Sequence, residues 1–401
     1  MKQEPGLTKS EFIFFLGILV YYTVSLLDLT VASTLLNEYG TILKGLRFLS
    51  YLLFLVAIID CYVTKHAFLF CTIAMCAMVF CAAFSTDRSV VYILLMLFAA
   101  TCSTSKRVII FIFSLQLLFF SMVVLMSQTG MIQDVIFDIS TRARHGLGFT
   151  WTSIPAILFF YISLEYIYIR SEKLKCIELF IMEFFHVILY VLTDSRMCFT
   201  IATISVFAIL VYKMKFRFIK ALYKFFLWIS PVIPIAVCAF SLFIHMGYQE
   251  NGAIWQKLNS FLSNRLQLGY DAVKQYGITM FGQKVEWIGN VKAAEGLEYN
   301  FVDCSYLQIM LNYGVLFLLF VICVYTVILL YAKKQKNVYV GIIVSISLVL
   351  SITEPRLWNI SFNAFPFLLI DVLNSGKWKE KVDNPISGNM LINKANSFSM
   401  R

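Results

Sequence analysis

The sequence contains few charged residues. Asp, Glu, Lys and Arg make up 14% of the 401 residues, whereas hydrophobic residues make up 60%. In a soluble domain about a quarter of the residues are charged and about half are apolar. The hydrophobic core of a soluble protein of this length could not bury the additional apolar residues. The composition therefore excludes a soluble protein and a disordered chain, and it indicates a polytopic membrane protein.

Several signatures of catalytic and metal sites are also missing. The sequence has no P-loop, no His-Glu-x-x-His pair and no Gly-x-Ser-x-Gly turn. The ten cysteines include no Cys-x-x-Cys pair and imply no disulfide framework. The four histidines are scattered and no loop contains Asp-x-Asp. We therefore expect no cofactor and no dedicated metal site, although carboxylates from separate loops could still meet. If the protein is an enzyme, its substrate must arrive already activated.

Apolar stretches recur along the whole chain, and each can cross about 30 Å of hydrocarbon as a helix. We expect about twelve such helices. The predicted fold is an all-α polytopic membrane protein that forms one integral membrane domain over residues 1–401. The predicted spans are 11–29, 46–62, 67–84, 89–104, 108–127, 153–170, 176–193, 197–212, 225–246, 305–331, 338–353 and 357–373.

The positions of the basic residues predict the orientation of the chain. If the N-terminus is cytoplasmic, most of the 33 Lys and Arg residues fall in short inner segments, as the positive-inside rule requires. We expect a multi-pass protein of the cell (plasma or inner) membrane with both termini in the cytoplasm. Anionic lipid headgroups account for the net charge of +10, so no nucleic-acid partner is needed.

Two outer loops are much longer than the others, a medium one at residues 128–152 and a large one at 247–304. Long loops in compact proteins are often functional. Within the large loop, apolar residues from Ile254 to Tyr276 recur at helical spacing. This pattern predicts a helix that either lies on the outer leaflet or caps the bundle.

Arginines gather on the predicted outer face, in short turns between spans and in the two longer loops. Charges near the hydrocarbon are costly and tend to be functional, although Arg196 and Arg356 could instead anchor phosphate headgroups. Guanidinium groups that converge on one face indicate an anion such as a lipid diphosphate. The residues concerned are Arg142, Arg144, Arg196, Arg265 and Arg356.

Transfer of a sugar from a lipid diphosphate needs a base for the attacking hydroxyl. The candidates are Glu354, His145, Asp194 and Asp303. Burial at a membrane edge would raise the pKa of Glu354 toward a useful range, but an ion pair with Arg356 is the alternative. Aromatic residues of the large loop could stack on sugars or simply anchor the loop at the interface. They are Trp255, Tyr270, Tyr276, Trp287 and Tyr299.

Short motifs in this order give the chain a resemblance to a known family. The turn Leu192–Arg196, the segment Arg144–Phe149, the sequence Asn264–Leu266 and the stretch Asp303–Gly314 carry it, followed by Glu354 as a late carboxylate. Together with the many spans and the late outer loop, they make most of the chain resemble the Wzy-type oligosaccharide repeat-unit polymerases of the O-antigen ligase and polymerase superfamily.

The chain departs from that family at two places. The family's turn has Gly where this sequence has Asp194, and its His-Pro-Asn is replaced by residues Thr150 to Ser153. The resemblance implies metal-independent transfer between undecaprenyl diphosphate-linked oligosaccharides, with Arg196 and Arg265 contacting diphosphates. It also implies a flippase and a chain-length regulator as partner proteins.

The prediction is therefore a glycan polymerase on the extracytoplasmic face. A ligase that transfers a finished glycan, and a flippase or transporter, remain as alternatives. The predicted catalytic residues are Arg196, Arg265, Glu354 and His145. The predicted substrate-binding residues are Arg142, Arg144, Asp194, Tyr270, Trp287, Asp303 and Arg356.

Overall fold

The protein is described here by a computed structural model. It describes residues 7–35, 39–59, 72, 74–76, 79, 83–85, 89–139, 142–214, 216–289 and 296–375. The predicted span at 67–84 lies largely outside these residues, as does the C-terminal segment from residue 376.

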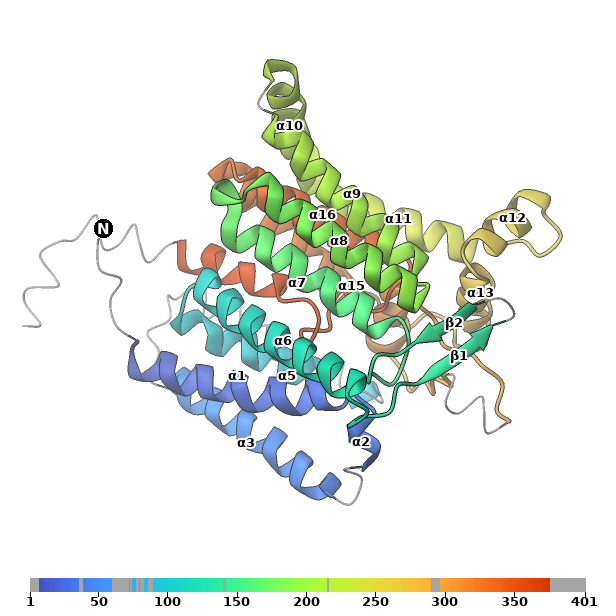
Figure 1. The fold of residues 1–401 in the computed structure, drawn as a ribbon, viewed down its shortest axis with the longest axis horizontal. Helices are drawn as coiled ribbons and strands as arrows, with labels where there is room; N and C mark the ends of the chain where they lie inside the picture. The colour runs from blue at the N-terminus through green and yellow to red at the C-terminus, as the bar shows by residue number, and fades with distance from the viewer. Residues whose placement is uncertain are drawn as a thin grey trace, which may run out of the picture.

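The described residues are mainly α-helical (Figure 1). The first half contains α1 (Lys9–Leu27), α2 (Ala32–Leu35), α3 (Gly40–Ile59), α5 (Ser89–Ala99), α6 (Ser105–Gln128), β1 (Ile136–Ile139), β2 (Arg142–His145), α7 (Ile154–Arg170) and α8 (Cys176–Thr193). The second half contains α9 (Arg196–Lys213), α10 (Arg217–Ile229), α11 (Ile233–Met246), α12 (Ala253–Phe261), α13 (Arg265–Tyr276), α15 (Ser305–Gln335) and α16 (Val338–Leu350). Short 3-10 segments are Ala100–Cys102, Ser171–Lys173, Ser230–Val232 and Phe365–Leu368.

Eight helical segments in the described part of the chain are long and apolar enough to cross a membrane. They are Lys9–Leu27, Gly40–Ile59, Ser105–Gln128, Ile154–Lys173, Cys176–Thr193, Arg196–Lys213, Arg217–Met246 and Ser305–Gln335. Ser89–Cys102, Val338–Leu350 and Phe365–Ser375 are apolar but shorter. The expectation of an all-α membrane protein is confirmed at this level, while the number of about twelve spans stays a prediction.

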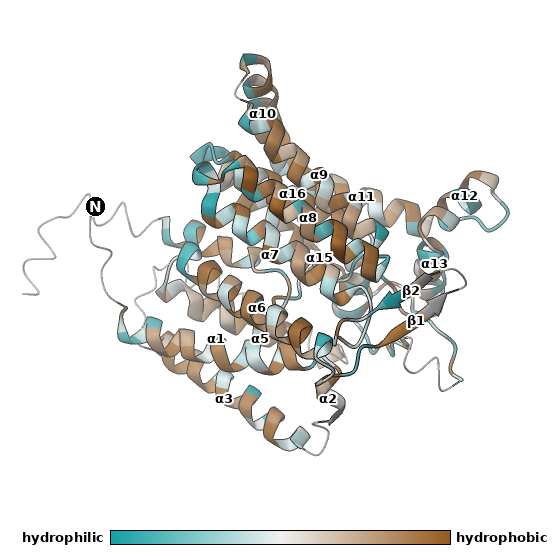
Figure 2. Ribbon diagram, in the orientation of Figure 1, coloured by the Kyte–Doolittle hydropathy of each residue, from teal (hydrophilic) through white to brown (hydrophobic). Residues whose placement is uncertain are grey.

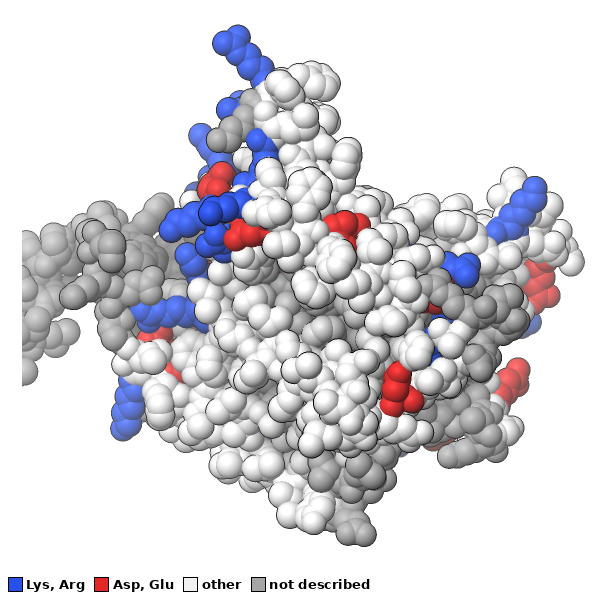
Figure 3. Space-filling model, in the orientation of Figure 1, with Lys and Arg blue, Asp and Glu red and all other residues white. Residues whose placement is uncertain are grey.

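The bundle is apolar along its middle and polar at its ends (Figure 2). Inside it, α15 and α16 pack against each other and against α11, and α16 also contacts α7 and α9. Fully buried aromatic side chains fill the space between the helices, among them Tyr22, Phe160, Tyr161, Phe317 and Tyr325. Lys and Arg gather at the end near α10 and the start of α1, and the middle of the visible face carries almost no charge (Figure 3).

The medium loop contains a β-hairpin at the opposite end of the bundle. β1 and β2 pair antiparallel, with Ile136 opposite His145. The Gly146 N–H donates to the Val135 carbonyl at 2.8 Å and extends the pairing by one residue beyond Ile136 and His145. Alternation over only four residues per strand is too short a signal to stand out in the sequence, and the hairpin was not predicted.

The predicted helix of the large loop is two helices, α12 and α13, separated at Leu262 to Asn264. Ser263 and Asn264 both have left-handed φ angles, of 55° and 64°, which ends one helix before the next begins. The two helices differ in their surroundings. α13 packs on α11 and α15 and buries Leu266, so it caps the bundle. α12 leaves Ile254 82% exposed and Phe261 73% exposed, as an interfacial helix would.

α15 is broken at Gly314, where φ is 88° and ψ is 172°. Beyond the break, the N–H groups of Val315 and Leu316 donate to the loop carbonyls of Thr279 (3.1 Å) and Met280 (3.2 Å). The loop backbone therefore packs against α15 at the break. It accepts hydrogen bonds from the two N–H groups that the break would otherwise leave unpaired. A glycine is required because a Cβ at position 314 would lie 2.3 Å from the Met280 oxygen.

The predicted last span, 357–373, is only partly helical. Residues 351–362 form consecutive turns, and helix begins at Phe365. Pro355 and Pro366 interrupt the helical hydrogen-bond pattern because proline has no N–H to donate. These turns bring Glu354 and Arg356 to the same end of the bundle as the hairpin and α13.

Substituting Gly314→Ala should destabilise the protein by about 2 kcal/mol or more, because alanine is strained at this φ and its Cβ meets the loop backbone. The check is thermal unfolding of the detergent-solubilised protein, followed by size-exclusion chromatography. Gly45→Ala is the matched control, since a Cβ at Gly45 in α3 meets nothing within 4 Å. An unchanged melting temperature for Gly314→Ala would contradict the break in α15.

Candidate functional site

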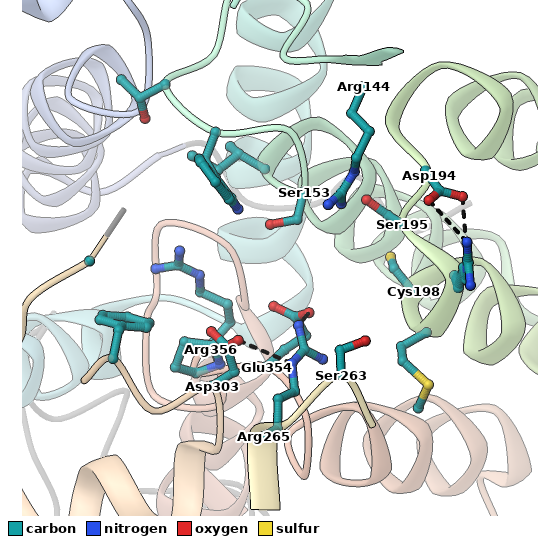
Figure 4. A pocket seen from close by; sticks show the side chains of 18 of the residues that line it. Arg144, Ser153, Asp194, Ser195, Cys198, Ser263, Arg265, Asp303, Glu354 and Arg356 are labelled. Carbon is teal, nitrogen blue, oxygen red and sulfur yellow. Dashed lines mark hydrogen bonds and ion pairs between the residues drawn. The ribbon is translucent and has the colours of Figure 1, made fainter. Parts of the chain in front are cut away.

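A cavity of about 830 Å³ opens at the end of the bundle near the hairpin and α13. It collects residues from six separate parts of the chain, and Figure 4 shows how the labelled side chains lie around it. Eight of the eleven predicted site residues line it, namely Arg144, Asp194, Arg196, Arg265, Trp287, Asp303, Glu354 and Arg356. The structure thus brings these arginines and carboxylates together around one cavity, and their roles stay predictions.

Arg265 lies between two carboxylates. Its Nε donates to Asp303 at 3.0 Å and its guanidinium NH2 nitrogen donates to Glu354 at 3.3 Å. The start of α13 is fixed because the buried Asn259 side chain accepts from the Gln267 N–H at 3.1 Å. Arg265 thereby joins the large loop to the start of α15 and to the turn after α16.

Ser305, the first residue of α15, holds the turn that carries Glu354 and Arg356. Its hydroxyl donates to the Glu354 carbonyl at 2.6 Å and accepts from the Leu357 N–H at 3.0 Å. Its own N–H donates to the Ser351 carbonyl at 3.0 Å. These three hydrogen bonds place the Glu354 carboxyl beside Asp303, two residues before Ser305.

Arg356 differs from Arg265 in its partners. Its guanidinium lies 4.6 Å from the centroid of the Phe362 ring, and its buried Nε makes no hydrogen bond. Among the described residues, no carboxylate lies within ion-pair distance of it. The positive charge of Arg356 is therefore available to a ligand in the cavity.

Asp194 and Arg196 form the turn between α8 and α9. Asp194 has a left-handed backbone, with φ of 51° and ψ of 34°, which glycine adopts freely and aspartate tolerates. Asp194 can therefore occupy the position at which the family that the chain resembles has Gly. Arg196 reaches Asp194 at 3.4 Å and is 77% exposed, so it lies at the rim of the cavity.

Arg144 reaches the cavity from β2. Its Nε donates to the Thr193 carbonyl at 3.0 Å, which ties the hairpin to the end of α8. No carboxylate within ion-pair distance neutralises it among the described residues. Burial lowers the pKa of Arg144, and the positive charges of Arg196 and Arg265 lower it further, while Asp194 opposes them. An anion between these arginines would relieve their mutual repulsion.

The carboxylates of the cavity are shifted toward their neutral forms. Burial raises the pKa of Glu354 to about 7, and Asp303 adds to the shift, although Arg265 opposes it. Burial also raises the pKa of Asp303, again against the effect of Arg265. A carboxyl group with a pKa near neutrality can accept and return a proton at physiological pH.

Three predicted site residues are not in the lining. His145 is held outside the cavity by Asp134, whose carboxylate lies 2.6 Å from its Nδ1 and also accepts from the Leu147 N–H at 2.7 Å. Tyr270 packs edge-on against Tyr248, with ring centroids 6.0 Å apart. The backbone of Arg142 lies in β2 opposite Ile139, and its side chain is outside the described residues.

Some lining residues were not predicted from the sequence, including Tyr190, Ser153 and Cys198. Tyr190 is predictable in principle, because it precedes Asp194 by one helical turn and so shares its face. The others depend on the packing of α7 against α8 and α9, which no local pattern reveals.

Searches of protein-family models, of curated proteins and of solved structures found no match to this chain. Within the described residues, no group of three or more His, Cys, Asp and Glu side chains could hold a metal ion. The site must therefore be interpreted from its own chemistry.

The raised pKa of Glu354 predicts a pH dependence of stability. The folded protein binds this proton more tightly than the unfolded chain, whose pKa is near 4.5. The contribution is therefore full below about pH 4.5 and is lost as the pH rises through 7. Glutamine does not titrate. The Glu354→Gln variant should therefore avoid up to about 3 kcal/mol of the loss in unfolding free energy that the wild type shows as the pH rises.

The measurement is thermal unfolding of the wild type and Glu354→Gln between pH 5 and 8 in detergent. The wild type should lose more stability over this range than the variant does. Parallel curves would show that Glu354 is already ionised in the folded protein at pH 5.

Proposed function

We propose that this protein is a membrane glycosyltransferase that polymerises lipid-linked oligosaccharide repeat units, as the Wzy-type polymerases that it resembles do. The observation that carries the proposal is a cavity in which four arginines meet a buried carboxyl group with a pKa of about 7. Its proposed substrates are undecaprenyl diphosphate-linked oligosaccharides, and the lipid bilayer delivers them.

The arginines suit a diphosphate leaving group. Arg144 and Arg356 have no ion-pair partner among the described residues, and Arg196 has only an exposed contact of 3.4 Å. Guanidinium groups bind phosphate oxygens in a bidentate manner and keep their charge at any physiological pH. They would stabilise the negative charge that develops on the diphosphate as the glycosidic bond breaks.

Glu354 is the proposed general base. The acceptor hydroxyl loses its proton to Glu354 as its oxygen bonds to the anomeric carbon of the donor sugar. The bond from that carbon to the diphosphate oxygen breaks, and its electron pair leaves with the lipid diphosphate. Arg265 holds the Glu354 carboxyl at 3.3 Å and so orients it. His145 is the weaker candidate, because it lies outside the lining and is held by Asp134.

The finer topology belongs to the same proposal. We place the basic end around α10 in the cytoplasm and the cavity on the extracytoplasmic side of the cell membrane, with about twelve spans in all. A flippase would supply the lipid-linked repeats to this side, and a chain-length regulator would limit the product. A ligase or a flippase stays as the alternative that the following experiment separates from a polymerase.

A strain that lacks this gene should lose its surface glycan ladder and accumulate single lipid-linked repeats on the outer leaflet. The wild-type gene should restore the ladder, whereas Arg144→Ala should reduce it at least about tenfold through the loss of a charged hydrogen bond to phosphate. Arg196→Ala should act in the same direction. The ladder is read by gel electrophoresis, and the lipid-linked sugars by mass spectrometry.

Arg217→Ala is the matched control, because Arg217 is an exposed arginine at the start of α10, and helix α9 separates it from Arg196 at the cavity. It should restore the ladder fully. Single repeats trapped on the inner leaflet would indicate a flippase, and long undelivered lipid-linked chains would indicate a ligase. An unchanged ladder in the deletion strain would refute all three functions.

Inorganic diphosphate should bind the purified protein in the presence of EDTA, since the proposed site uses guanidinium groups rather than a metal. The expected signal is a rise in melting temperature as diphosphate is added, because a ligand of the folded state stabilises it. Arg144→Ala should weaken the effect about tenfold. A shift that EDTA abolishes would show that diphosphate binds through a metal ion.

A further inference from the structure

A second cavity, of about 570 Å³, adjoins the first. Arg356, Pro355, Leu29 and Phe301 line both cavities, so the two meet at the turn after α16. The second cavity lies between α15 on one side and α1, α3 and α5 on the other. No step of the proposed reaction involves this cavity.

Three amide side chains in this cavity are each fixed at one end. Asn312 Oδ1 accepts from Trp287 Nε1 at 3.0 Å, and Asn359 Oδ1 accepts from the Ser361 N–H at 3.1 Å. Gln308 Nε2 donates to the Val302 carbonyl at 2.8 Å. Among the described residues, nothing bonds to the other ends, which are Nδ2 of both asparagines and Oε1 of Gln308. The cavity thus offers two hydrogen-bond donors and one acceptor. Each belongs to an amide side chain whose other end is fixed by a hydrogen bond within the protein.

Aromatic rings and hydroxyl groups complete the lining. Tyr51 of α3 and Tyr92 of α5 stack with ring centroids 3.8 Å apart and planes 2° apart. The Tyr313 hydroxyl lies 3.3 Å from the Ser89 hydroxyl. Flat apolar rings beside fixed hydrogen-bonding groups match a sugar, which has apolar faces and a rim of hydroxyls.

The charges argue for a neutral ligand here. Of the two arginines in the lining, Arg47 is paired with Asp28, and Arg356 lies where the first cavity begins. A diphosphate would find one available guanidinium, compared with several in the first cavity. A lipid chain would bury the free amide ends without partners, at a cost of about 1–3 kcal/mol for each group.

We propose that the second cavity binds the uncharged terminal sugar of the acceptor oligosaccharide. This inference rests on the proposed function. The donor sugar is joined directly to the diphosphate and so must lie with the arginines of the first cavity. The acceptor sugar must approach it from elsewhere, and the shared wall at Arg356 and Pro355 puts the second cavity beside the point of transfer.

The test uses the full-length protein in nanodiscs and two probes. One is inorganic diphosphate, and the other is the free repeat oligosaccharide released from the surface glycan by mild acid. Asn312→Asp and Asn359→Asp keep the oxygen that each asparagine uses within the protein and remove the donor that faces the cavity. Each should weaken oligosaccharide binding about tenfold and leave diphosphate binding unchanged, which also shows that the variant is folded.

Asn337→Asp is the matched control. Asn337 Oδ1 caps α16 by accepting from the Val340 N–H at 3.1 Å, and aspartate can do the same. This variant should bind both probes like the wild type. Arg144→Ala should show the reverse selectivity, with diphosphate binding weakened and oligosaccharide binding kept.

Two results would overturn the inference. One is wild-type oligosaccharide binding in both asparagine variants, and the other is displacement of the oligosaccharide by saturating diphosphate, which would put the sugar in the first cavity. The proposed function fails separately, through an unchanged ladder in the deletion strain and no binding of diphosphate. If the ladder is lost on deletion and diphosphate binds, normal sugar binding by the variants refutes this inference alone.

Discussion

The end of the bundle that carries the first cavity depends on the contacts of Arg265 with Asp303 and Glu354. All three side chains are largely removed from water, and each buried ion costs several kcal/mol unless it is paired. The three residues come from α13, from the segment before α15 and from the turn after α16. Since the Arg265 guanidinium keeps its charge, it can be buried only together with these carboxyl groups, and the contacts tie the large loop to the turn after α16.

The same contacts distinguish Arg265 from the other arginines of the cavity. The resemblance implies that Arg265 contacts a diphosphate, but its guanidinium already serves two carboxylates at 3.0 and 3.3 Å. A phosphate would have to displace one of them. Arg144 and Arg356 carry no such partners among the described residues, so in the proposed reaction they and Arg196 are better placed to hold the diphosphate. We therefore interpret Arg265 chiefly as the residue that positions Glu354.

Much of the bundle was predictable because hydropathy is a local property. An apolar run of about twenty residues has few alternatives to a spanning helix, and charges at the ends of such runs must gather at the two surfaces. This is why Arg144, Arg196, Glu354 and Arg356 could be grouped before their contacts were known. The grouping required only that they end spans on the same side.

What the sequence did not reveal depends on contacts between distant residues or on backbone geometry. The apolar spacing from Ile254 to Tyr276 continues through the left-handed residues Ser263 and Asn264, so periodicity could not locate the break. His145 was predicted as a candidate base. The hairpin places its Nδ1 2.6 Å from the Asp134 carboxylate, a contact that the sequence did not reveal. The last apolar run was predicted as one span from its hydropathy, although it contains Pro366, and residues 351–362 form turns instead.

The break at Gly314 links this backbone geometry to both cavities. Because glycine permits a φ of 88° there, the loop carbonyls of Thr279 and Met280 can bond to the second part of α15. The loop then continues alongside the helix to Trp287, whose indole N–H donates to Asn312. Trp287 lines the first cavity and Asn312 the second. One hydrogen bond therefore fixes a wall of each cavity, and movement of the loop would alter both together.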